Sequence, residues 1–103
     1  ESSYLHAIEL EPKYVRALYG LSVLYVFEFN RPEEAIPYLE RVLAAEQRNV
    51  EAMFVIARAY YMTGKYDQSV AMYDRILSIS IDKERKAEAE ANKATVLEKA
   101  YEH

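Results

Sequence analysis

Two stretches of this chain repeat the same pattern of side chains at an offset of 35 residues, counted from Ala17 to Ala52. In each stretch a large apolar residue is followed three positions later by an aliphatic residue, then by a small one, and three positions further by Tyr. The two sets are Leu18, Leu21, Ser22 and Tyr25, and Met53, Ile56, Ala57 and Tyr60. Steps of three and four keep each set on one face of a helix. A repeat of this length predicts stacked helical units that bury a continuous core, which constrains the fold more than any other feature.

Each stretch is followed by residues that start a second helix. Pro32, Glu33 and Glu34 form a good first turn, because the missing proline N–H costs nothing there and the carboxylates favour the positive end of the helix dipole. Asn30 and Gly64 precede the two second helices, and they are the residue types best suited to a left-handed helix end. The pattern therefore predicts two helical hairpins.

The two hairpins differ in length by one residue. The span from Tyr25 to Ala35 is one residue longer than the corresponding span from Tyr60 to Ser69. We expect six helices in all, near residues 2–11, 13–29, 32–45, 49–63, 66–81 and 83–101.

The composition agrees with a helical domain. Of the 103 residues, 51% are hydrophobic and 29% are charged, and only 2 are Gly and 3 are Pro. A sheet protein needs more turn residues than that, so the scarcity of helix breakers favours long helices. The length corresponds to a single domain, residues 1–103, and because the chain begins with Glu1 we interpret it as part of a longer repeat protein.

Residues 82–103 fit the repeat less well. One side of the expected helix carries mostly small residues, namely Ala87, Ala91, Ala94, Leu97 and Tyr101, and the opposite side carries mainly Lys and Glu. Helical stacks end in a helix with an apolar inner face and a solvated outer face. We expect the small residues to form the inner face of a capping helix, and a diverged first helix of a further repeat is the alternative.

The repeated residues resemble a tetratricopeptide repeat. The best match follows the family's order of aliphatic, small, Tyr, Gly, Tyr, small and aromatic residues: Ile56, Ala57, Tyr60, Gly64, Tyr66, Ser69 and Tyr73. The resemblance implies an all-α fold, a right-handed α-solenoid of antiparallel helix hairpins with about two and a half repeats and a C-terminal capping helix. It divides the chain into the second helix of a truncated repeat, two repeats and the capping helix, at residues 1–12, 13–47, 48–81 and 82–103.

The chain lacks the residues that the common catalytic and metal sites need. It has no Cys, which excludes disulfides, thiolate chemistry and the common zinc sites. Its two histidines, His6 and His103, lie at opposite ends of the sequence, and its two glycines are isolated, so we expect neither a histidine metal pair nor a phosphate-binding loop. The prediction is therefore no enzyme, no cofactor and no metal.

The charge pattern argues against nucleic acid as a partner. There are 17 acidic and 13 basic side chains, and the longest basic cluster, Lys83, Arg85 and Lys86, is interleaved with carboxylates. Proteins that bind nucleic acid usually carry a basic patch. No apolar run approaches the roughly 20 residues that span a bilayer, so we expect no membrane insertion. The 35-residue offset leaves a pentatricopeptide-like RNA binder as a remote alternative.

The resemblance also implies where a partner would bind, because in this family the first helix of each hairpin lines a concave groove. The implied groove residues are Arg16, Tyr19, Val23 and Val26 in the first repeat and Glu51, Phe54, Arg58 and Tyr61 in the second. Helical spacing places them on a face other than that of the core residues. Exposed aromatic side chains beside Arg are typical of interaction surfaces.

We therefore predict a monomeric, non-catalytic scaffold that binds a peptide or helix of an unidentified partner protein in this groove. Two alternatives stay open. The chain could be a structural or self-assembly segment of a larger helical repeat protein, and the groove could be filled by another part of the same protein.

Overall fold

The structure is a computed structural model that describes residues 12–80 and 82–101. Every regular element within these residues is helical, which confirms the expected all-α class. The elements are α2 (Pro12–Val23), the short π-helix η1 (Leu24–Glu28), α3 (Pro32–Ala45), α4 (Val50–Met62), α5 (Tyr66–Ile79) and α6 (Lys83–Ala100). The helix expected near residues 2–11 lies outside the described residues, as do His6 and His103.

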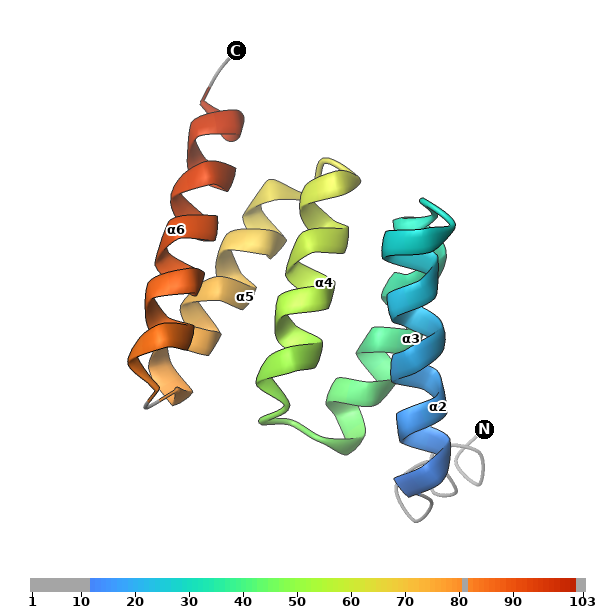
Figure 1. Cartoon of the computed structure of the whole chain (residues 1–103). Helices are drawn as coiled ribbons and strands as arrows, with labels where there is room; N and C mark the ends of the chain where they lie inside the picture. The colour runs from blue at the N-terminus through green and yellow to red at the C-terminus, as the bar shows by residue number, and fades with distance from the viewer. Residues whose placement is uncertain (1–11, 81, 102–103) are drawn as a thin grey trace.

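Consecutive helices pack against each other as antiparallel hairpins. α2 with η1 packs on α3, α4 packs on α5, and α6 packs on α5. Figure 1 shows α2, α4 and α6 in one layer and α3 and α5 in a second layer behind it. The first helices of the hairpins therefore share one face of the molecule, as the repeat predicts.

Local side chains set several of the helix ends. The Asn49 and Asp82 side chains each accept a hydrogen bond of 3.0 Å from a backbone N–H in the first turn of α4 and of α6. Asn30 and Gly64 have positive φ angles of 56° and 82° in the two hairpin turns, which confirms the left-handed helix ends expected at both positions. These caps satisfy backbone groups that a helix terminus would otherwise leave without partners.

The apolar core runs continuously through both hairpins, between the two layers. Its largest fully buried apolar side chains are Leu39, Met53, Ile56, Ile76 and Val42. Burial of one such side chain stabilises a fold by roughly 1.5–3 kcal/mol relative to exposure. The core residues expected in the second hairpin, including Ala57 and Tyr60, are all buried.

The additional residue of the first hairpin forms η1. The Phe29 N–H donates to the Leu24 carbonyl oxygen at 2.9 Å, a spacing of five residues instead of the four of an α-helix. Before η1 the two hairpins correspond at an offset of 35 residues. After it they correspond at 34, since Asn30 matches Gly64. One widened turn therefore absorbs the additional residue.

The widened turn changes which residue faces the core. Val26, expected on the concave surface, is 2% exposed and takes the place that Tyr60 occupies in the second hairpin. That prediction was wrong because it carried the 35-residue offset through η1. Leu21, expected in the core as the counterpart of Ile56, is 37% exposed. Among the described helices α4 packs against both α3 and α5, whereas α2 packs mainly against α3.

The buried side of α6 is not the one expected. Ala89 and Val96 are buried, and the five residues expected there are exposed or only half-buried: Ala87, Ala91, Ala94, Leu97 and Tyr101. The Lys93 Nζ lies 2.5 Å from the Asp74 Oδ1 of α5 on the side that packs. Alanines offer little apolar area, so burial of Val96 and polar pairs with the neighbouring helices decide how α6 is turned.

Candidate functional site

We call the layer formed by α2, α4 and α6 the first-helix layer (Figure 1). Its exposed face carries three adjoining cavities, which together we call the groove. The basal cavity, of about 410 Å³, lies at the N-terminal ends of α4 and α6 and is lined by residues that include Arg48, Ser80 and Asp82. The middle cavity, of about 420 Å³, is lined by residues that include Tyr19, Glu51, Phe54, Glu84, Arg85 and Glu88. The aromatic cavity, of about 250 Å³, is lined by Phe27, Phe54, Val55, Arg58, Tyr73, Glu88 and Asn92.

Neighbouring cavities share side chains. Glu51 and Arg85 line both the basal and the middle cavity, and Phe54 and Glu88 line both the middle and the aromatic cavity. The three cavities therefore adjoin one another across the first-helix layer, from α2 and η1 to α6.

Four of the eight expected groove residues line these cavities, namely Tyr19, Glu51, Phe54 and Arg58. Val26 is in the core, and Val23 is half-buried and packs against it. Arg16 is exposed but lines none of the three cavities. Tyr61 packs against Tyr66, with ring centroids 5.9 Å apart, and also lies outside the three cavities.

The groove contains residues that sequence reasoning did not place there. Phe27 of η1, which is 52% exposed, lines the aromatic cavity, whereas Tyr61, its counterpart at the 34-residue offset, does not. On α6 the groove residues are Arg85, Glu88 and Asn92, which follow Glu51, Phe54 and Arg58 by 34 residues each. Extending the 34-residue offset into α6 would have predicted these three groove residues. The sequence analysis did not extend it, because Glu90 stands where the repeat pattern has an aliphatic residue.

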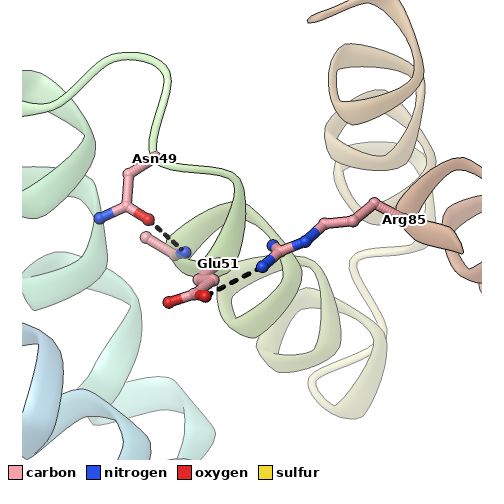
Figure 2. Close-up of polar contacts among 4 residues, drawn as sticks. Asn49, Glu51 and Arg85 are labelled. Carbon is pink, nitrogen blue, oxygen red and sulfur yellow. Dashed lines mark hydrogen bonds and ion pairs between the residues drawn. The ribbon is translucent and has the colours of Figure 1, made fainter. Parts of the chain in front are cut away.

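Two contacts between neighbouring helices shape the walls. The Arg58 guanidinium carbon lies 5.4 Å from the centre of the Phe27 ring, so a cation stacks on an aromatic face between α4 and η1. Arg85 of α6 bonds to a Glu51 carboxylate oxygen at 3.0 Å, next to the Asn49 cap at the start of α4 (Figure 2). Each contact holds a groove side chain of one helix against a side chain of a neighbouring helix.

Three ionisable groups of the groove have raised pKa values, those of Tyr19, Tyr73 and Arg85. Burial raises the pKa of Tyr19, and Glu51 raises it further while Arg85 opposes this. Burial is also the main cause of the raised pKa of Tyr73. The hydrogen bond to Glu51 is the main reason that the pKa of Arg85 is raised. The hydroxyls of Tyr19 and Tyr73 are therefore neutral at pH 7, and Arg85 is positively charged.

Neither metal chemistry nor membrane insertion is indicated by the described part of the chain. Within residues 12–80 and 82–101, no group of three or more His, Asp and Glu side chains is arranged to hold a metal ion. None of the helices described in this range is both long enough and apolar enough to cross a bilayer. What the groove offers chemically is aromatic surface, carboxylates and guanidinium groups.

Comparison with known proteins agrees with this architecture. The sequence model of the family described as tetratricopeptide repeat matches residues 26–85, more than half of the chain. The chain is 30% identical over 79 residues to tetratricopeptide repeat protein 8 of Caenorhabditis elegans. That alignment covers 77% of this chain and 15% of the relative, so the chain spans only a small part of the relative's length.

Proposed function

The chain belongs to the tetratricopeptide repeat family, and we propose that its groove holds a segment of another protein. Repeats of this family generally mediate protein–protein interaction and are generally non-catalytic scaffolds. The observation that supports the proposal here is the groove from α2 and η1 to α6. Phe27 is 52% exposed in it, and Tyr19 and Phe54 are half-buried.

Aromatic and Arg side chains carry much of the binding energy in protein interfaces. Aromatic rings bury a large area with few rotatable bonds, and the planar guanidinium of Arg stacks on rings and donates several hydrogen bonds. Phe27, Phe54 and Arg58 form such a set around the aromatic cavity. Stacking of Arg58 on Phe27 holds both side chains in place before a partner arrives. This preorganisation lowers the entropy cost of binding.

Peptide selection and mutation test the proposal together. Peptides that bind the chain are selected from a random displayed library, and their affinities are measured for the parent and for Phe54→Ala with Arg58→Ala. We expect the selected peptides to lose at least about tenfold in affinity for this variant, which corresponds to about 1.4 kcal/mol.

The matched control removes one aromatic residue and one Arg elsewhere. Tyr101→Ala with Arg31→Ala changes an exposed aromatic and an exposed Arg outside the three cavities, and should leave the affinities unchanged. Helical circular dichroism of all variants shows whether the fold is kept. Equal binding of the selected peptides to a folded groove variant would exclude the groove as their site.

A structural or self-assembly role is the second candidate, and both ends of the helix stack favour it. Leu21 and Leu24 are 37% and 43% exposed on α2 and η1, and Ala87, Ala91 and Ala94 are exposed on α6. The end repeats of a stack have a side that no neighbouring repeat covers. Sedimentation at several concentrations separates the two candidates: a mass that rises with concentration supports self-assembly, and a constant monomer mass supports the scaffold. An RNA-binding role is disfavoured, because the carboxylates of the middle cavity would repel phosphate.

A further inference from the structure

The middle cavity of the groove has a charge that its own residues do not neutralise. Four carboxylates line it, from Glu51, Asp82, Glu84 and Glu88, together with a single guanidinium from Arg85. Arg85 is already bonded to Glu51 at 3.0 Å, so this pair is internally neutral.

The carboxylates of Glu84 and Glu88 form no ion pair within residues 12–80 and 82–101. They lie four residues apart on α6 and therefore on the same helix face. Glu84 is in the first turn of α6, where a carboxylate also stabilises the helix dipole, but that effect fades beyond the first turn and does not explain Glu88.

Aromatic rings face the same cavity. Tyr19 of α2 and Phe54 of α4 line it together with the two glutamates of α6. A Lys or Arg side chain gains from both kinds of group, because carboxylates attract its charge and aromatic faces attract a cation within about 6 Å. Its aliphatic stem can also lie along the rings.

The adjoining aromatic cavity offers an exposed aromatic ring beside its charged groups. Of its aromatic and aliphatic lining residues, Phe27 is 52% exposed, Phe54 is half-buried, and Val55 and Tyr73 are buried. An apolar side chain of a bound segment can pack on the exposed Phe27 ring there.

We infer that the segment held in the groove is basic: a Lys or Arg side chain lies in the middle cavity between Glu84 and Glu88 and the rings of Tyr19 and Phe54, and an apolar side chain of the same segment lies in the aromatic cavity. This inference rests on the proposed function, in which the groove binds a protein segment. The net charge of −4 for the whole chain favours the approach of such a partner.

The probes are fluorescein-labelled octapeptides in which Lys and Leu alternate, Glu and Leu alternate, or Lys and Ser alternate. Their affinities are measured by fluorescence anisotropy for the parent chain and for Glu84→Gln with Glu88→Gln, which removes both charges at nearly constant size. The matched control is Glu90→Gln with Glu98→Gln, because these exposed glutamates lie on the same helix outside the three cavities and the net charge changes equally.

The Lys–Leu peptide should bind the parent more tightly than either other peptide. Its affinity should fall roughly tenfold in the Glu84→Gln and Glu88→Gln variant, stay unchanged in the control, and weaken as salt is added. The inference is overturned if the control loses as much affinity, if the Glu–Leu peptide binds as tightly, or if the Lys–Leu peptide does not bind.

Phe27→Ala separates this failure from a failure of the proposed function. Phe27 is 52% exposed, so its truncation removes groove surface with little loss of core. If the peptides selected from the random library lose affinity in this variant while the Lys–Leu peptide shows no dependence on Glu84 and Glu88, the groove remains the binding site and only its preference for basic segments is wrong. If the selected peptides are also insensitive to Phe27→Ala and to the change of Phe54 and Arg58, the groove is not the site.

Discussion

The Ser69 hydroxyl of α5 donates a buried hydrogen bond of 2.8 Å to the Ala57 carbonyl oxygen of α4. This contact joins the two helices of the second hairpin directly. In the first hairpin the same two positions hold Ser22 and Ala35, and there the Ser22 hydroxyl bonds within its own helix to the Leu18 carbonyl oxygen at 2.7 Å. Each hairpin therefore places one Ser and one Ala at its crossing, and all four side chains are fully buried.

Ala57→Leu should destabilise the fold strongly. Ala57 is 0% exposed and its carbonyl oxygen is within hydrogen-bond distance of the facing helix, so three more carbon atoms must push α4 and α5 apart. Overpacking of this kind costs about 1–3 kcal/mol or more, which lowers the melting temperature by roughly 4–8 °C per kcal/mol in a domain of this size. Thermal unfolding followed by circular dichroism measures it. Ala71→Leu, on the exposed side of α5, is the control, and equal melting temperatures for both variants would contradict the assigned crossing.

Exchange of the Ser and the Ala at the second crossing should be tolerated. Ser69→Ala alone removes one buried hydrogen bond and should cost about 0.5–1.5 kcal/mol. Adding Ala57→Ser should recover part of that loss, because Ser22 shows that a Ser at this position can bond within its own helix. Urea unfolding of the single and double variants measures the recovery. A double variant less stable than the single one would show that the two hairpins do not share this geometry.

The two glycines should respond in opposite directions to substitution by Ala. A Cβ at either Gly20 or Gly64 would meet no atom within 4 Å, so the backbone alone decides the outcome. Gly64 has a φ of 82°, where a side chain is strained by roughly 1–2 kcal/mol, so Gly64→Ala should lower the melting temperature. Gly20 lies inside α2, where Ala is more favourable than Gly by roughly 0.5–1 kcal/mol, so Gly20→Ala should raise it. Stabilisation by both changes would rule out the left-handed turn at Gly64.

The pair between Arg85 and Glu51 should stabilise the docking of α6 in a salt-dependent way. Its side chains are 35% and 63% exposed, so the effect is small and screened by ions. Arg85→Gln should lower the melting temperature slightly at low ionic strength and have almost no effect at high ionic strength. Lys86→Gln, an exposed neighbour on α6, is the control for the loss of one positive charge. An Arg85→Gln effect that did not change with salt would point to packing instead of charge.

Alkaline pH should destabilise the protein through its buried tyrosines. Burial is the main cause of the raised pKa of both Tyr60 and Tyr73, and the carboxylate of Glu40 adds to it for Tyr60. A raised pKa favours the protonated form in the folded state. The stabilisation is therefore complete below the unfolded value of about pH 10 and is lost as pH rises through the folded value.

Chemical unfolding measured at several pH values above 9 checks this prediction. Tyr73→Phe removes a hydroxyl that must ionise in a buried place, so the loss of stability with rising pH should be shallower than in the parent. Tyr101→Phe changes a side chain that is 82% exposed and should leave the decline as it is in the parent. The same decline in all three proteins would exclude Tyr73 as its cause.

The alignment of the two repeats shows which parts of the fold could be predicted from the sequence. The second hairpin was placed correctly, since Ile56, Ala57 and Tyr60 are buried and Gly64 has positive φ. The first hairpin was placed correctly up to Ser22, apart from Leu21, and at Asn30 and Ala35 again. Between Ser22 and Asn30 the first hairpin has one additional residue, but the sequence does not show which helical turn is widened to accommodate it. That choice depends on whether Val26 or Tyr25 packs better against α3, which only the assembled hairpin decides.

In the last helix, α6, the ends were predicted correctly but the buried side was not. Its ends were predicted closely, since a helix was expected near residues 83–101 and α6 spans Lys83–Ala100 with Asp82 as its N-cap. Its buried side was predicted wrongly, because a helix of Ala, Lys and Glu has no strong apolar stripe. No hydrophobic pattern in the sequence therefore predicted that Glu88 and Asn92 would line the groove.

The amino-acid sequence by itself determined the helices, their hairpin pairing and the close Ser–Ala crossings, because these depend on local periodicity, caps and small residues a fixed distance apart along the chain. The tertiary structure alone decided the widened turn at η1, the rotation of α6 and hence the set of side chains in the groove. The physical reason is that a groove is built from the sides of helices that the core leaves uncovered. Which sides those are depends on how each helix is turned against its neighbours, and a weak apolar stripe or one additional residue leaves that rotation to packing.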